Sequence, residues 1–319
     1  MKTKLLTLIT LLLCVVQVNA QQGKPSVKVF SNFNYDMNPE EGEAEFKEFE
    51  LKRAYLGYSY SMDENFSTIV TFDVGSNDGG SAYTAFLKIA ALNWKYSENL
   101  NLSFGMIGTK NFKFMEKAWG RRYIEKSALD KYKWANAADL GLSASYNLSD
   151  KISLEGQIHN GEGYKKTQGS NGLFRGGAGI TCKVNSNIAL RLFHDVTPRA
   201  KYSDSTETQN ITTGAITYKG NSFTIGAESS LMQNANNISD EEQELMSIYG
   251  SFKLSDNFTL FARYDDATET NRAGTYMIYG VERMMTKGVK IALNVQSWTD
   301  DVDDAEAQNT LFLNLEYKF

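Results

Sequence analysis

The last eleven residues of the chain, 309–319, alternate between two kinds of side chain and end on an aromatic residue. One face of an extended strand would carry Leu311, Leu313, Leu315, Tyr317 and Phe319, and the other would carry Phe312, Asn314, Glu316 and Lys318. Soluble domains rarely end on such a strand, whereas the last strand of an outer-membrane barrel must close against the first. This ending therefore predicts a closed barrel whose last strand pairs with residues 26–36.

The rest of the sequence divides into strand-length segments joined alternately by short turns and longer polar stretches. The short turns lie near Asp63, Glu98, Asp150, Ser186, Gly220, Asp256 and Lys287. The longer stretches are about 38–44, 76–81, 110–136, 161–171, 198–209, 234–243, 266–272 and 299–308. Seven turns and eight loops connect sixteen strands, and an even number places both termini on the short-turn side. The sequence predicts an all-β, transmembrane antiparallel barrel over residues 21–319.

Period-two alternation assigns a lipid face and a lumen face to each predicted strand. Slipping a strand by one residue would move its charges into lipid, so the phase is well determined. The charged residues assigned to the lumen face are Arg53, Arg175, Lys183, Arg191, Arg263, Asp73, Asp139, Glu155, Glu228 and Asp265. Two strands fit poorly: the phase changes near 90–91 within 82–96, and both faces are apolar in 274–285. A bulge or a subunit interface would explain either strand.

Residues 1–20 have the features of a secretion signal. Lys2 and Lys4 precede an apolar run over 5–16, and small residues lead to a cleavage site after Ala20. We therefore expect export, and location in a Gram-negative outer membrane as a multi-pass barrel. The net charge of −5 argues against nucleic-acid binding. A soluble β-sandwich is the competing architecture, but the glycine-rich segment 172–183 would pack its core badly.

The 110–136 stretch is basic and aromatic, unlike the other loops. Its acids are Glu116, Glu125 and Asp130, and its eight basic residues are Lys110, Lys113, Lys117, Arg121, Arg122, Lys126, Lys131 and Lys133. It would be the third extracellular loop, partly helical across 114–132. We expect it to fold into the lumen and narrow a channel that a barrel this wide leaves open. Positive walls would concentrate anions there. The residues expected to form this constriction and bind anions are Lys113, Lys117, Arg121, Arg122, Lys126, Lys131 and Lys133. Pairing of the basic residues with lumen carboxylates, as a neutral scaffold, is the alternative.

Four segments carry a family resemblance. They read F-E-L-K-R-A-Y-L-G at 49–57, F-G-M-I-G-T-K-N-F-K-F-M-E-K at 104–117, A-D-L-G-L-S at 138–143 and H-N-G-E-G-Y at 159–164. Together they resemble the phosphate-selective porin O and P family, in a variant similar to porin-like proteins of the Bacteroidetes lineage. The resemblance implies a channel for small solutes that assembles as a homotrimer. The mixed lumen charges depart from the basic ladder of the phosphate-selective members, which leaves the solute open.

The sequence favours a passive porin for small hydrophilic solutes and ions, with an anion preference set by the loop. A barrel hydrolase is disfavoured because no serine stands in a nucleophile setting near His159 or His194, so we predict no enzyme and no cofactor. Asp300, Asp301, Asp303 and Asp304 lack the spacing of a calcium loop and favour a solvated acidic loop, without metal. A non-conducting structural or adhesive barrel remains an alternative, although the other loops are short.

Overall fold

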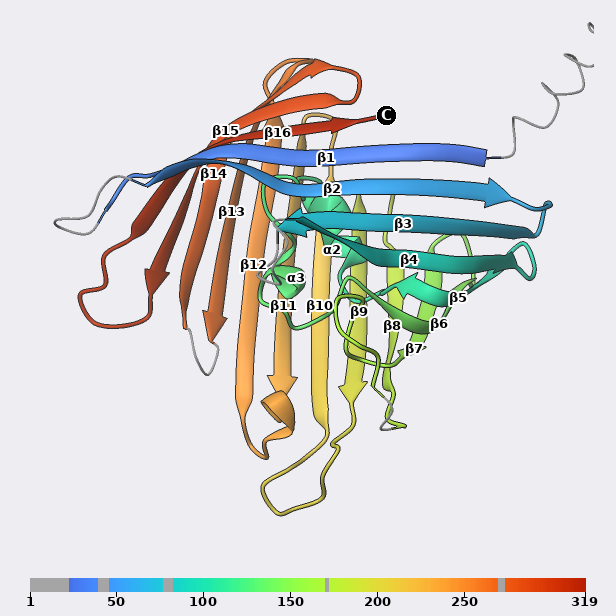
Figure 1. The fold of residues 1–319 in the computed structure, drawn as a ribbon. Coiled ribbons are helices and arrows are strands. Elements are labelled where there is room, and N and C mark those ends of the chain that lie inside the picture. Colours follow the sequence, from blue (N-terminus) through green and yellow to red (C-terminus); the bar gives the residue numbers. More distant parts are fainter. Residues whose placement is uncertain (1–22, 40–45, 77–82, 170–171, 269–272) are drawn as a thin grey trace, which may run out of the picture.

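The computed structural model describes residues 23–39, 46–76, 83–169, 172–268 and 273–319, so the expected secretion signal lies outside it. The described residues form sixteen strands in one closed antiparallel barrel (Figure 1), as predicted. The strands are β1 (Gly23–Asp36), β2 (Lys47–Ser61), β3 (Phe66–Ser76), β4 (Tyr83–Lys95), β5 (Leu100–Gly108), β6 (Ala138–Asn147), β7 (Ile152–His159), β8 (Arg175–Lys183), β9 (Ile188–Thr197), β10 (Gln209–Lys219), β11 (Phe223–Gln233), β12 (Glu242–Lys253), β13 (Phe258–Thr268), β14 (Gly274–Thr286), β15 (Val289–Asp300) and β16 (Gln308–Lys318).

The barrel closes through the strand at which the sequence ends. Strand β16 pairs antiparallel with β1, with Asn314 opposite Asn32. The Val27 N–H donates to the Phe319 carbonyl at 3.0 Å, and the Phe319 N–H returns a bond to Val27 at 3.1 Å. Asn314 is fully buried inside the barrel, while Leu313, which precedes it, is 42 % exposed on the outer surface. The predicted pairing and the predicted faces of this strand are confirmed.

Short turns gather at one end of the barrel and long loops at the other (Figure 1). Five of the short turns share one design, in which a side-chain oxygen accepts the backbone N–H groups two and three residues further along. The accepting residues are Asp63, Ser97, Ser149, Asn185 and Ser255. These local bonds explain why the turns have similar sequences, each with a Ser, Asp or Asn at the accepting position.

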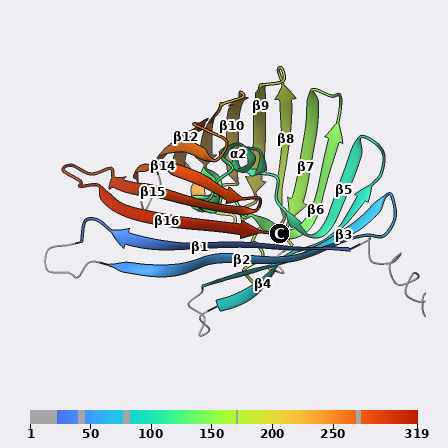
Figure 2. The ribbon, with the colours of Figure 1, turned by 90° about the horizontal axis from the view of Figure 1, so that it is seen from above.

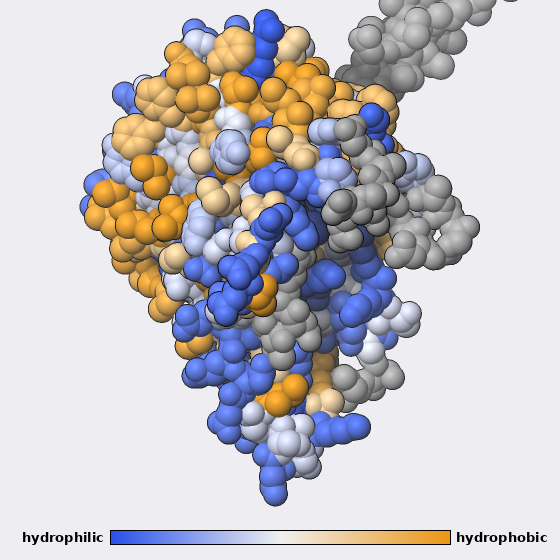
Figure 3. All heavy atoms as spheres, turned by 90° about the vertical axis from the view of Figure 1, so that its left-hand side faces the viewer, coloured by the Kyte–Doolittle hydropathy of each residue, from blue (hydrophilic) through white to orange (hydrophobic). Residues whose placement is uncertain are grey.

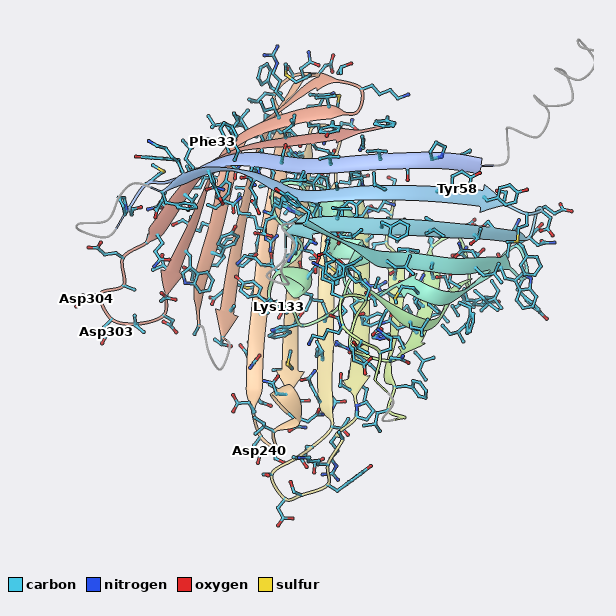
Figure 4. The ribbon with its side chains drawn as sticks, in the orientation of Figure 1. Phe33, Tyr58, Lys133, Asp240, Asp303 and Asp304 are labelled. Carbon is cyan, nitrogen blue, oxygen red and sulfur yellow. The ribbon has the colours of Figure 1, made fainter. Side chains whose placement is uncertain are left out.

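The outer surface of the barrel is apolar, and many of its large hydrophobic side chains are exposed. Phe104 is 66 % exposed, Leu192 53 % and Leu293 49 %. Figure 3 shows apolar residues gathered on the upper part of one face, with hydrophilic residues toward the tip where the long loops lie. Tyr58 lies near the short-turn end of β2 (Figure 4), where outward aromatics suit a membrane–water interface. None of the described helices is long and apolar enough to cross a bilayer.

Two β-bulges each turn an additional lysine into the lumen. In β2 the register shifts so that Lys52 is the extra residue, and Lys52 and Arg53 both reach lumen partners. In β4 the extra residue is Lys88, which points toward Asp73. A bulge bends its strand and re-aims a side chain. The phase change expected near 90–91 is therefore a bulge at Lys88.

The other irregular strand, β14, needs a different explanation from the two expected. Its inward residues Tyr276 and Ile278 are 7 % and 1 % exposed and belong to a hydrophobic cluster inside the barrel. Met277 and Tyr279 face outward. Both faces are apolar because one meets the barrel exterior and the other meets the inward loop. The register shift in β14 lies near Met284, beyond this stretch.

Candidate functional site

The connection between β5 and β6 lies inside the barrel, as predicted. It contains two short helices, α2 (Lys113–Trp119) and α3 (Ala128–Lys131), separated by irregular chain. Seen from above, α2 lies within the ring of strands (Figure 2). Gly120 ends α2 in the left-handed conformation with a φ of 66°, where a residue without a side chain fits best. The sharp turn there sends the loop back toward the wall.

Aromatic residues anchor this loop on the wall formed by the C-terminal strands. The Trp119 ring is 1 % exposed and packs edge-on to Tyr249 and Phe261, with ring centres 6.0 and 6.1 Å away. The Tyr123 hydroxyl donates to Glu282 at 2.8 Å. The resulting cluster fills the β10–β15 side of the lumen. The opposite side of the lumen is the part that this cluster leaves unfilled.

Four basic side chains from the wall hold the backbone of the loop. Each donates to a loop carbonyl oxygen: Arg191 to Lys110 (2.8 Å), Lys52 to Ile124 (2.9 Å), Arg263 to Lys126, and Arg175 to Trp134 (2.8 Å). The three arginines also pair with wall carboxylates, namely Glu155, Asp265 and Asp195. For these arginines the structure favours the scaffold alternative, because each guanidinium charge is paired with a carboxylate and each side chain holds the loop in place.

Three adjoining cavities lie beside the loop, lined by residues that the structure describes. The largest, about 860 Å³, extends to the short-turn end at Lys287 and Lys318. The other two, of about 280 and 260 Å³, lie on the other side of Arg122, and residues 162–166 of the β7–β8 loop border the smaller one. Arg122 lines all three. Its side chain therefore stands where the cavities meet, and we call this point the neck.

Arg122 is held at the neck by two acids of its own loop. Its Nη1 atom lies 2.5 Å from Asp130 Oδ2, and the same nitrogen contacts Glu116. Tyr55 of β2 borders the neck from the opposite wall and also lines two of the cavities. The guanidinium is thus held by two carboxylates at the point where the three cavities meet.

A second loop also reaches into the lumen, which the sequence did not predict. The Asp139 carboxylate accepts the N–H groups of Gly161 and Gly163 at 2.7 and 3.1 Å, and Tyr164 N–H bonds to the Ala138 carbonyl. Gly161 and Gly163 have φ of 110° and 85°, which a side chain would strain. The segment H-N-G-E-G-Y is the feature of the sequence that could have indicated this inward loop, because two glycines follow a histidine that is buried. The β7–β8 loop therefore shares in the constriction.

Asp73 of β3 joins this second loop to the bulged strands. It is fully buried and accepts Arg53 at 3.2 Å and the Tyr164 hydroxyl, with Lys88 at 3.9 Å. Burial and the neighbouring Asp73 charge raise the pKa of Tyr164, so the phenol keeps its proton and donates. Burial lowers the pKa of the Lys165 ammonium, and Arg53 acts in the same direction. One carboxylate thus fixes three polar groups beside the neck.

Replacing Asp73 with asparagine should strengthen any anion preference of the lumen. The amide still accepts hydrogen bonds, but Arg53 and Lys88 lose their counter-charge. A unit charge at about 4 Å is worth about 1 kcal/mol in water, so the anion-to-cation permeability ratio should rise about two- to fivefold. Reversal potentials under a salt gradient measure this. Asp256→Asn, which loses a carboxylate of an exposed turn paired with Lys253, should leave the ratio unchanged; an equal rise in both variants would contradict a local effect.

The seven basic loop residues expected at the constriction do not form a single ring. Lys113, Arg122, Lys126 and Lys133 line the cavities, and Figure 4 marks Lys133. Arg121 turns to the wall, 3.5 Å from Glu282 and over the Phe261 ring. Lys131 stacks on Tyr276, 3.6 Å from the ring centre, and Lys117 is exposed outside the cavity linings. Sequence alone could not separate these roles, since alternation says nothing about an irregular loop.

The cavity linings carry an excess of positive charge. Their acidic side chains are Glu50, Glu116, Glu125, Asp130 and Glu162. Their basic side chains are Lys28, Lys52, Arg53, Lys88, Lys113, Arg122, Lys126, Lys133, Lys165, Lys166, Lys287 and Lys318. Within the described ranges, Lys113, Lys126, Lys133 and Lys165 form no ion pair. These four ammonium groups add to a field that attracts anions.

The two histidines occupy different environments. His159 is buried, with Nδ1 2.9 Å from Asp139, and helps to hold the carboxylate that fixes the β7–β8 loop. His194 bonds to Thr212 in an exposed position. Among the described residues no group of three or more His, Cys, Asp or Glu side chains could hold a metal ion. Asp303 and Asp304 lie on an outer loop (Figure 4).

Solved structures share this fold at low sequence identity. The anion-selective porin from Comamonas acidovorans superposes with a TM-score of 0.71 at 9 % identity, covering 93 % of this chain and 99 % of the porin. The outer membrane channel DcaP of Acinetobacter baumannii gives 0.67 at 13 % identity, with 93 % and 97 % covered. A trimer form of the outer membrane protein OmpT of Vibrio cholerae gives 0.64 at 12 % identity, with 93 % and 99 % covered. No family model and no curated protein sequence matches the chain. These likenesses show the fold, a sixteen-stranded porin barrel.

Proposed function

We propose that the chain is a porin of the Gram-negative outer membrane, which lets small hydrophilic solutes pass by diffusion with a preference for anions. The observation that carries the proposal is Arg122, which stands where three adjoining cavities meet inside a closed barrel. An inward loop that leaves one side of the lumen open is the arrangement expected of a selective pore. The basic excess of the lining supplies the preference.

Planar-bilayer recording tests this function. The purified barrel should give discrete conductance steps, and a potassium chloride gradient should give a reversal potential of the sign that chloride permeation produces. Because such fields are screened within about 10 Å at 0.1 M salt, the preference should weaken as salt rises. Absence of discrete steps would contradict the porin, and cation selectivity at low salt that is unchanged by replacing Arg121 and Arg122 would contradict the anion preference.

Three finer properties belong to the same proposal. The family resemblance and the trimer form of the Vibrio protein support a homotrimer, which mass measurement in detergent would test. The mixed lumen charges support a broad preference for small anions over one for phosphate, so phosphate should compete with chloride no better than succinate does. Residues 1–20 should be absent from the mature protein, which N-terminal sequencing of membrane-extracted material would test.

A further inference from the structure

The largest of the three lumen cavities combines apolar and charged surface in its lining, which a simple salt filter does not require. It combines apolar surface from Ile89, Phe112 and Ala137 with the ammonium and guanidinium groups of Lys88, Lys113 and Arg122. Phe112 is 3 % exposed and belongs to the cluster that anchors the loop, so its contribution to the wall is fixed. Glu116, the one acidic side chain of this lining, is bonded to Arg122.

The apolar and cationic groups meet at Gly108, the last residue of β5. A Cβ placed there would lie 2.5 Å from Lys113 Nζ and 3.6 Å from Ile89 Cδ1. The ammonium group therefore occupies the space that a side chain at position 108 would need, and the Ile89 methyl group lies beside it. Lys113 is exposed and, within the described ranges, has no ion-pair partner. Ile89 faces inward because the bulge at Lys88 resets the phase of β4.

Resting on the proposed function, we propose that this cavity favours carboxylates that carry an apolar group, such as an aromatic ring. The carboxylate would pair with Lys113 and lie within the field of Arg122. The ring would cover the half-buried Ile89 and Ala137. Ligand sites commonly join a mostly apolar wall to a few charged groups that set orientation. A small hydrophilic anion such as acetate gains only the charge contact, because it has little apolar surface to bury.

Block of chloride current in planar bilayers tests the inference. The probes are sodium benzoate, sodium acetate and the neutral benzyl alcohol. Benzoate should block at about tenfold lower concentration than acetate, the factor expected when roughly 50 Å² of apolar surface leaves water. Benzyl alcohol should block no better than acetate. Equal block by benzoate and acetate would overturn the apolar contribution, and block by benzyl alcohol as strong as that by benzoate would overturn the charge contribution.

Two variants locate the effect. Ile89→Thr keeps a branched side chain but removes the methyl group at Gly108, so the benzoate-to-acetate difference should fall to about twofold. Lys113→Gln should weaken block by both carboxylates, whereas Lys117→Gln, on the same helix but outside the cavity linings, should change neither. An unaltered benzoate preference in Ile89→Thr would overturn the assigned place. Absence of chloride conductance in the unmodified protein would instead overturn the proposed function, and the inference with it.

Discussion

Replacing Arg122 with alanine is expected to shift the channel toward cations and to raise its conductance. The change opens the point where the three cavities meet and leaves Glu116 and Asp130 without their shared partner. A positive group at the neck then gives way to two carboxylates. With about 1 kcal/mol per unit charge at 4 Å in water, the anion-to-cation permeability ratio should fall at least about fivefold. Single-channel conductance and reversal potential at low salt measure the two effects.

Two further variants make this result specific to the neck. Arg122→Lys keeps the charge but loses the planar fork, so it should retain most of the anion preference with a moderate rise in conductance. Lys117→Ala removes a charge from the same loop outside the cavity linings, and it should change selectivity little. A fall in selectivity of equal size in Lys117→Ala would mean that total lumen charge, and no particular position, sets the preference.

Replacing Trp119 with alanine is expected to release the inward loop from the wall. The indole is almost fully buried, packs against Tyr249 and Phe261, and donates to the Glu125 carbonyl at 2.9 Å. Truncating a buried tryptophan costs about 3–5 kcal/mol, most of which falls on the contact between loop and wall. The barrel itself should persist, because its strands pair without this residue. We expect conductance to rise severalfold, with flickering between levels and a loss of ion preference.

The matched control is Trp94→Ala, which removes an indole from the outer surface. Trp94 is 38 % exposed and stacks on Phe66 at the short-turn end of β4. Its loss should weaken heat resistance of the barrel in detergent without changing conductance. Protease digestion of intact barrels separates the two variants further, since only the Trp119 variant should expose the 110–136 segment to cleavage. Unchanged conductance in Trp119→Ala would mean that the four backbone bonds alone hold the loop.

The barrel could be predicted well from the sequence because short-range patterns determine most of its structure. Turn chemistry at residues such as Asp63 and Ser149 sets the strand boundaries, and alternation sets the faces. Closure by Phe319 against Val27 follows from the fold itself. Each of these rules acts over a few residues, so one sequence contains enough information to apply it.

The lumen was harder to predict because its contacts join residues far apart in the chain. Lys88 faces inward only because a bulge inserts it, and a strict period of two assigns no side chain to a bulged position. Arg121 and Arg122 are neighbours in an irregular loop, yet one meets the wall and the other the water path. The bond from Tyr164 to Asp73 spans 91 positions. Alternation along a strand contains no information about such pairs.

The backbone and the side chain of Lys126 have different roles. Its carbonyl oxygen is held by Arg263 of the wall, while its side chain lines two of the cavities. Every amino acid has the same carbonyl, so any residue at this position can keep the attachment. Natural variation at position 126 can therefore alter what solutes meet without disturbing where the loop sits. In the porin proposed above, one substitution at this position would change the charge of the pore wall while the loop keeps its place.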